Sequence, residues 1–148
     1  MNKIIPVVTT PYDWLHTVEE SDLDQNRHVN NVVYVKWMEN VAIKNSSSWG
    51  LTPEFYLHLG ATWVARRHTI EYLHQAFLGD ELIIRTWISE IKRVSSVRSY
   101  EIIRPADGLT IATGETLWAF VNISDGRPTR ILPEVMEAIE RAKVENNS

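Results

Sequence analysis

The sequence predicts the α+β class, with an antiparallel sheet of about five strands packed against one long central helix. Three observations predict it. Apolar residues recur with helical spacing from Asn30, apolar and polar residues alternate through most of 61–123, and turn motifs divide that alternating part into strands. Tight turns join antiparallel neighbours, and one long helix can cover one face of such a sheet.

The first part of the chain predicts a strand followed by the long helix. Residues 13–18 are expected to form the strand, which leads into an acidic stretch at 19–22. Asn30 is the expected N-cap, because its side-chain oxygen can accept a hydrogen bond from an unpaired amide of the first turn. The serines and glycine of 46–50 are expected to end the helix. Its expected apolar face includes Val33, Trp37 and Val41.

The remaining elements follow from caps, alternation and turns. Thr52 followed by Pro53 predicts a short second helix, since threonine caps well and proline suits the first helical position. The clearest alternating runs are 82–88 and 109–123, and the turn motifs fall at 78–80, 106–108 and 124–126. A closing helix is expected over about 133–143. Its expected inward-facing residues are Val135, Met136 and Ile139.

The whole chain, residues 1–148, is interpreted as one domain with an ordered core over about 13–143. No linker or repeat divides it. The first twelve and last five residues are expected to be loosely held ends. Because one helix covers only one face of the sheet, the other face and the edges favour assembly into a homodimer or homotetramer.

Composition excludes several classes of function. The formal net charge is −4 and no basic stripe is present, which argues against a nucleic-acid partner. The absence of cysteine removes disulfides, thiolate-bound zinc and a thiol nucleophile. No apolar run reaches the roughly 20 residues of a membrane-spanning helix, and no signal peptide is recognisable. We expect a cytoplasmic protein with no membrane partner.

Residues 21–34 concentrate carboxylate, imidazole and amide side chains ahead of the long helix. A helix N-terminus offers unpaired N–H groups and the positive end of a dipole, which suit a developing oxyanion. A carboxylate held nearby can attack a carbonyl directly or deprotonate a water molecule that does so. The segment is therefore a candidate for acyl-transfer or hydrolytic chemistry.

Other interpretations of this segment stay open or can be excluded. Aspartate and asparagine cluster before helices simply because they cap and turn well, and His28 alone fits a structural hydrogen-bonding role. The spacing of Asp22, Asp24 and Asn26 also suggests a calcium loop. That loop requires glycine at its sixth position and glutamate at its twelfth, where this chain has Arg27 and Val33. No metal site is expected.

The same segment resembles a known signature. The run Asp22-Leu23-Asp24-x-Asn26-x-His28-Val29-Asn30-Asn31-x-x-Tyr34 is similar to that of the 4-hydroxybenzoyl-CoA thioesterase-like hotdog family, nearest to the version in plant and bacterial acyl-ACP thioesterases. Further similarity lies at 70–72, 79–87, 112–116, 125–128 and 132–134, so that the resemblance covers roughly 13–139 in the family's order. It implies a hotdog fold, in which the sheet wraps around the central helix.

The resemblance also implies roles for individual residues. Asp24 matches the family's nucleophile or general base, Asn26 and His28 match residues that orient the carboxylate or the thioester, and Asp22 is the structural member of the pair. The expected oxyanion donor is the main-chain N–H of Asn31. The residues expected to bind substrate are Asn30, Tyr34, Gln75 and Trp63. Gln75 stands where plant-type members have glutamate; because glutamine cannot accept a proton, this favours a CoA-type mechanism centred on Asp24.

The implied substrate is an acyl-CoA or acyl-ACP thioester, hydrolysed without a cofactor. In the hotdog fold an acyl tunnel lies between the long helix and the neighbouring subunit's sheet. Candidate lining residues, each of which could equally be core, are Trp37, Met38, Trp49, Phe55, Tyr56 and Trp63. Arginines that could meet the nucleotide end of CoA, or be solvated surface charges, are Arg93, Arg98, Arg127 and Arg130.

A second class of function stays open. The chain could be a hotdog module that binds acyl thioesters or acyl chains without hydrolysing them. The presence of Asp24, Asn26 and His28 together favours an enzyme. A hotdog dehydratase would need a different arrangement of histidine and aspartate, which the sequence does not show.

Overall fold

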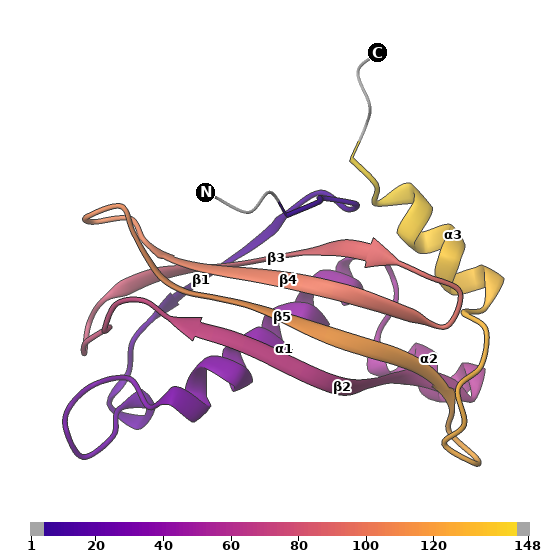
Figure 1. Ribbon diagram of the computed structural model, residues 1–148, viewed down its shortest axis with the longest axis horizontal. Helices are drawn as coiled ribbons and strands as arrows, with labels where there is room; N and C mark the ends of the chain where they lie inside the picture. Colours follow the sequence, from indigo (N-terminus) through magenta and orange to yellow (C-terminus); the bar gives the residue numbers. More distant parts are fainter. Residues whose placement is uncertain (1–4, 145–148) are drawn as a thin grey trace.

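The computed structural model describes residues 5–144, in which one five-stranded antiparallel sheet packs against a long helix (Figure 1). The strands are β1 (Tyr12–Thr17), β2 (Ala61–Tyr72), β3 (Glu81–Ile91), β4 (Ser95–Arg104) and β5 (Leu109–Asn122). Their order across the sheet is β1-β3-β4-β5-β2. The predicted α+β class and antiparallel sheet are confirmed.

The long helix α1 (Asn31–Ser48) crosses one face of the sheet, as Figure 1 shows. On its predicted apolar face Trp37 and Val41 are buried and Val33 is partly buried, and side chains of α1 meet the inner face of the sheet in one core. The largest fully buried members of this core include Met38, Val41, Leu82, Ile84, Tyr100 and Ile102. Gly114 on β5 allows the close approach: a Cβ there would lie 3.0 Å from the Met38 side chain and 3.2 Å from the Thr69 carbonyl oxygen.

Local signals set the helix ends. Asn30 caps α1, with its Oδ1 accepting from Val32 N at 3.1 Å, as predicted. Thr52 caps α2 (Pro53–Leu59) through its Oγ1, which accepts from Phe55 N at 3.1 Å. A one-turn 3₁₀ helix, η1 (Glu20–Asp22), occupies the acidic stretch. Among the described residues, no helix is long and apolar enough to cross a membrane.

The closing helix α3 (Pro133–Arg141) covers a second, smaller core at the end of the sheet near α2 (Figure 1). Val135 and Ile139 are buried there as predicted, and Met136 is partly buried.

The expectation of a loosely held N-terminal segment is wrong for Val8 and Thr9, whose amides donate to Ile88 O at 2.8 and 3.3 Å. Val144 N donates to Val8 O at 3.0 Å. The rest of the predicted loose C-terminus lies outside the described residues.

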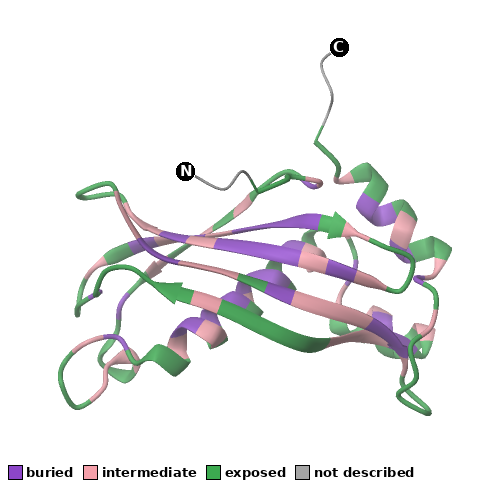
Figure 2. Cartoon of the chain, viewed as in Figure 1, coloured by how far each residue is buried: buried purple, intermediate pink, exposed green. Residues whose placement is uncertain are grey.

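The strand β2 forms one edge of the sheet. It pairs only with β5. The next strand along the chain, β3, lies next to β1 near the opposite edge, so the chain crosses the sheet between β2 and β3. The pairs β3–β4 and β4–β5 are then formed by neighbours in sequence. Figure 2 shows the middle of β2 as an exposed stretch at the edge, with β5 beside it and the largely buried β4 beyond β5. Residues 65–69 are all exposed.

Candidate functional site

A tight loop precedes α1 and presents Asp24. An isolated antiparallel bridge joins Leu23 to Val29, and Asp24 N donates to His28 O at 2.8 Å. The loop closes at Arg27, whose N donates to Asp24 O at 3.1 Å and whose φ of 64° lies in the left-handed region. The backbone around Asp24 is therefore fixed on both sides by main-chain hydrogen bonds.

The Asp24 carboxylate uses one oxygen to hold this loop. Its Oδ1 accepts from Asn26 N at 2.9 Å and from His28 N at 3.2 Å. Within residues 5–144, Oδ2 accepts no hydrogen bond and Asp24 forms no ion pair. The side chain is half-buried. One oxygen thus anchors the carboxylate, and the other is available to a substrate or a water molecule.

The start of α1 supplies a free donor beside this loop. Asn30 satisfies the amides of Val32 through its side chain and of Val33 through its carbonyl, the latter at 2.8 Å. The amide of Asn31 has no acceptor among the described residues, as expected for the first position of a helix. Tyr72 Oη donates to Asn31 O at 3.0 Å and so ties the end of β2 to the start of the helix.

These groups border one cleft of about 700 Å³. It brings together five of the sequence-predicted site residues: Asp24, His28, Asn31, Tyr34 and Gln75. Burial raises the pKa of Tyr34 to about 12, so its hydroxyl remains protonated and able to donate at neutral pH.

The remaining predicted site residues do not line this cleft. The Asn26 side chain is exposed at the tip of the loop, where only its main-chain amide contacts Asp24. The Asn30 side chain caps the helix. Trp63 lies elsewhere, with its Nε1 donating to Tyr56 Oη at 2.9 Å beside a second, apolar cavity.

Asp22 is held in a structural position, as expected. Its Oδ2 accepts from Glu19 N at 2.9 Å and lies 3.0 Å from His16 Nε2. The main-chain carbonyl of Asp22 also accepts from Asn30 N at 2.9 Å. Asp22 therefore fastens the loop between β1 and α1, and its carboxylate is already engaged.

Sequence reasoning missed Arg104 and Phe77, which also line the cleft. Arg104 Nη1 donates to Gln75 O at 3.0 Å and to Asp80 Oδ2 at 2.9 Å, which holds the loop that carries Gln75. Phe77 packs edge-on against the His28 ring, with centroids 5.5 Å apart. Neither has a local signal, because both reach the cleft through long-range pairing of the sheet.

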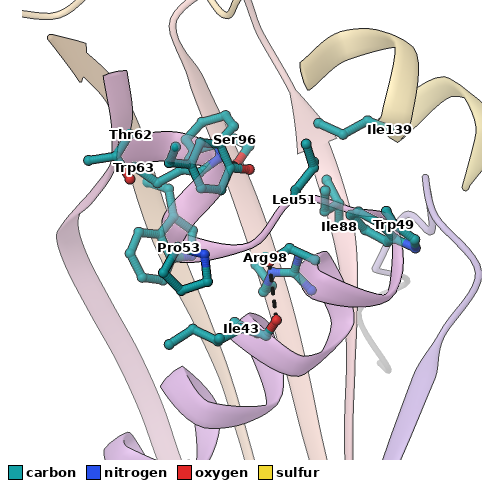
Figure 3. Close-up of a pocket in the computed structure, with 14 residues that line it drawn as sticks. Ile43, Trp49, Leu51, Pro53, Thr62, Trp63, Ile88, Ser96, Arg98 and Ile139 are labelled. Atoms are coloured by element: carbon teal, nitrogen blue, oxygen red, sulfur yellow. Dashed lines mark hydrogen bonds between the residues drawn. The ribbon is translucent and has the colours of Figure 1, made fainter. Parts of the chain in front are cut away.

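The aromatic and arginine candidates divide by location. Trp37 and Met38 belong to the core, and Phe55 packs against the smaller core. Trp49, Tyr56 and Trp63 line the apolar cavity (Figure 3).

Three of the arginine candidates are exposed: Arg93, Arg127 and Arg130. Arg98 is buried and lines the apolar cavity, so its interpretation as a solvated surface charge is wrong.

Fold and site together define a class: a sheet around a central helix, with an anchored carboxylate and a free amide at the helix start bordering one cleft. The family model of the thioesterase-like superfamily matches residues 18–139. The chain belongs to this superfamily, and this membership supports thioester hydrolysis as its general activity. A search of curated protein sequences found no match.

Solved structures share the fold at low sequence identity. A Lactobacillus plantarum protein, described provisionally as an oleoyl thioesterase, is similar with a TM-score of 0.83 and 20% identity over 89% of this chain; the chain spans only 51% of that protein. The DHNA-CoA thioesterase of Staphylococcus aureus matches with a TM-score of 0.81 and 19% identity, covering 88% of this chain and 89% of that one. Staphylococcus aureus SAV2348, solved in complex with CoA, matches with a TM-score of 0.83 and 18% identity, covering 100% and 93%. The hotdog fold is confirmed.

Proposed function

We propose that this protein hydrolyses an acyl thioester of coenzyme A or acyl carrier protein to the free acid and thiol, with Asp24 as general base or nucleophile. The observation that carries the proposal is the free Oδ2 of an otherwise anchored Asp24, beside the unpaired Asn31 amide in one cleft. An acyl-CoA is the favoured substrate. Gln75 cannot take a proton from water, and two of the structural relatives are named for a CoA substrate or a CoA complex.

The steps follow from these two groups. The thioester carbonyl oxygen accepts a hydrogen bond from Asn31 N–H, and the helix dipole stabilises the negative charge that develops there. Asp24 Oδ2 either attacks the carbonyl carbon or takes a proton from a water molecule that attacks it. Collapse of the tetrahedral intermediate breaks the C–S bond. On the general-base route this gives the free acid directly; on the nucleophilic route it gives a mixed anhydride with Asp24, which a water molecule hydrolyses to the free acid and the restored carboxylate. A thiol with a pKa of roughly 8.5 leaves readily as thiolate, so no strong acid is needed at the sulfur.

The neighbouring residues have positioning roles in this proposal. The main-chain amides of Asn26 and His28 fix Asp24 Oδ1, which leaves Oδ2 of this cleft residue free to react. The His28 ring, held against Phe77, and the Gln75 side chain are placed to orient the thioester or the attacking water. Asn30 acts through the helix cap, and Tyr34 offers a protonated hydroxyl at the cleft. Trp63 contributes only through the apolar cavity.

A panel of short, long and aromatic acyl-CoAs, followed by a thiol-reactive dye, tests the proposal. We expect release of free thiol from at least one acyl-CoA. The same acyl groups on acyl carrier protein form the second arm. If folded protein releases no thiol from either the acyl-CoAs or the acyl carrier proteins, but binds the same thioesters in calorimetry, the protein is a binding module without hydrolysis.

A further inference from the structure

The second cavity contains a buried arginine without a carboxylate partner. Arg98 on β4 is 6% exposed. Its Nη1 donates to Asn45 Oδ1 at 2.9 Å and to Thr86 Oγ1 at 3.2 Å, and both acceptors are neutral. No acidic side chain of residues 5–144 forms an ion pair with it. The Trp49 ring lies 5.8 Å from the guanidinium carbon.

A buried cation in this state is costly and retains unused donors. Removal of an ion from water is unfavourable unless a counter-charge compensates it, and burial lowers the pKa of Arg98. A guanidinium has five N–H donors, and both hydrogen bonds of Arg98 come from Nη1. Among the described residues, the one fully enclosed side-chain polar atom without a partner is Tyr100 Oη. The Nε and Nη2 groups of Arg98 have no acceptor among the described residues and are not fully enclosed, and Arg98 lines the cavity.

The cavity suits a compact apolar molecule. Its volume is about 260 Å³, just below the ~300 Å³ at which pockets for drug-sized ligands begin. Figure 3 shows Arg98 between Trp49 and Ile88 on one side and Pro53 and Trp63 on the other. Tyr56 adds a second polar group: its hydroxyl accepts from Trp63 Nε1 and keeps its own proton, because burial raises its pKa to about 12.

This cavity is separate from the Asp24 cleft within one chain. The cleft touches α1 at Asn31 and Tyr34, whereas the cavity begins at Ala42, roughly 12 Å beyond Tyr34 on a helix that rises ~1.5 Å per residue. Between them, Trp37, Met38 and Val41 are packed into the core. Arg98 therefore has no part in the proposed hydrolytic step of its own chain.

We propose that this cavity binds a compact apolar molecule bearing one carboxylate, with the carboxylate on the free N–H donors of Arg98 and the apolar part against Trp63 and Trp118. The carboxylate supplies the counter-charge that the described residues lack, and a carboxylate accepts two parallel N–H donors from a guanidinium. Two sources share this chemistry. One is a free carboxylic acid. The other, which rests on the proposed function, is the distal carboxylate of an acyl group whose thioester lies in the Asp24 cleft of a neighbouring chain, because the two sites are separate within one chain.

Calorimetry on the full chain with phenylacetate, cyclohexanecarboxylate and their neutral amides tests the proposal. We expect each acid to bind at least ~10-fold more tightly than its amide, as a charge-assisted hydrogen bond provides. This preference should disappear in Arg98→Met and persist in Arg93→Met, a matched removal of an exposed arginine. Arg98→Lys, which retains the positive charge, is the second variant if Arg98→Met does not fold. It should keep part of the preference.

A kinetic arm identifies the source. If the ligand is an acyl group, the ratio of kcat/KM for glutaryl-CoA over butyryl-CoA should fall at least ~10-fold in Arg98→Met. Acid binding without this fall identifies the free acid as the ligand. Hydrolysis of no acyl-CoA and no acyl-ACP, with acid binding intact, would overturn the proposed function and leave this site standing. Equal affinity for acids and amides in the unaltered protein, with an unchanged kinetic ratio, would overturn the site.

Discussion

At the scale of single residues, the two aspartates of the Asp22–Asp24 pair differ in what their carboxylates contact. Asp22 binds Glu19 N and the His16 ring, whereas Asp24 Oδ2 forms no hydrogen bond or ion pair with the described residues. Their two-residue spacing gives no reason to prefer one of them as the reactive group. The hydrogen bonds separate an anchoring carboxylate from an available one.

Asp24→Asn tests that assignment. The amide keeps the size of the side chain and an oxygen for the Asn26 and His28 amides, but it cannot take a proton or attack a carbonyl effectively. We expect kcat to fall at least ~100-fold, the scale for loss of a general base, with little change in thermal stability. The rate is measured by thiol release from the best acyl-CoA.

Asp125→Asn is the matched control. Asp125 Oδ1 accepts from Arg127 N at 2.9 Å, the same two-residue turn contact that Asp24 makes with Asn26, but in the turn after β5. The activity of this variant should equal that of the unaltered protein. A similar loss in both variants, or full activity in Asp24→Asn, would refute the role of Asp24.

At the scale of elements, helix caps and turns were predictable because their signals are local. Asn30 before α1 and Thr52-Pro53 at α2 need only a polar acceptor or a fixed φ at the right position. The grouping of Asp24, His28 and Asn31 also follows largely from one loop and the helix start. The resemblance supplied Gln75, whose place beside them depends on a distant segment.

Contacts between segments far apart in the chain could not be predicted from the sequence. The attachment of Val8 to β3, the position of β2 at the sheet edge and the contact of Arg104 with the Gln75 loop all depend on segments far apart in the chain. The burial of Arg98 was not predicted for a similar reason. A charged residue in a strand is ordinarily exposed, and only the packing of α1 over β4 buries it.

The cap of α1 links stability to activity, and Asn30→Ala tests the link. We expect a loss of about 1 kcal/mol in the free energy of unfolding by urea, typical of a lost N-cap. We also expect kcat to fall about 10-fold, because the first turn that presents Asn31 N–H loosens. Thr52→Ala removes an equivalent cap from α2, away from the cleft. It should cost similar stability and leave kcat unchanged; equal kcat values in the two variants would contradict the link.

At the scale of the whole molecule, β2 leaves one edge of the sheet open. Its middle, residues 65–69, is exposed, and an unpaired edge strand offers a row of N–H and C=O groups to another chain. If β2 pairs with its own copy in antiparallel fashion about its midpoint, the first residues of β2 in one chain lie beside the last residues in the other. Those last residues include Tyr72, which borders the Asp24 cleft. The start of β2 includes Trp63, which lines the apolar cavity.

This geometry predicts that assembly and activity are coupled. We expect a homodimer or homotetramer in light scattering at micromolar concentration, and a specific activity that falls on dilution at the concentration where the assembly dissociates. Addition of an inert protein such as serum albumin controls for loss of enzyme on surfaces. Because a neighbouring chain would border the cleft, the two transitions should coincide. A fully active monomer would show that the Asp24 cleft is complete within one chain and that the exposed edge of β2 serves another purpose.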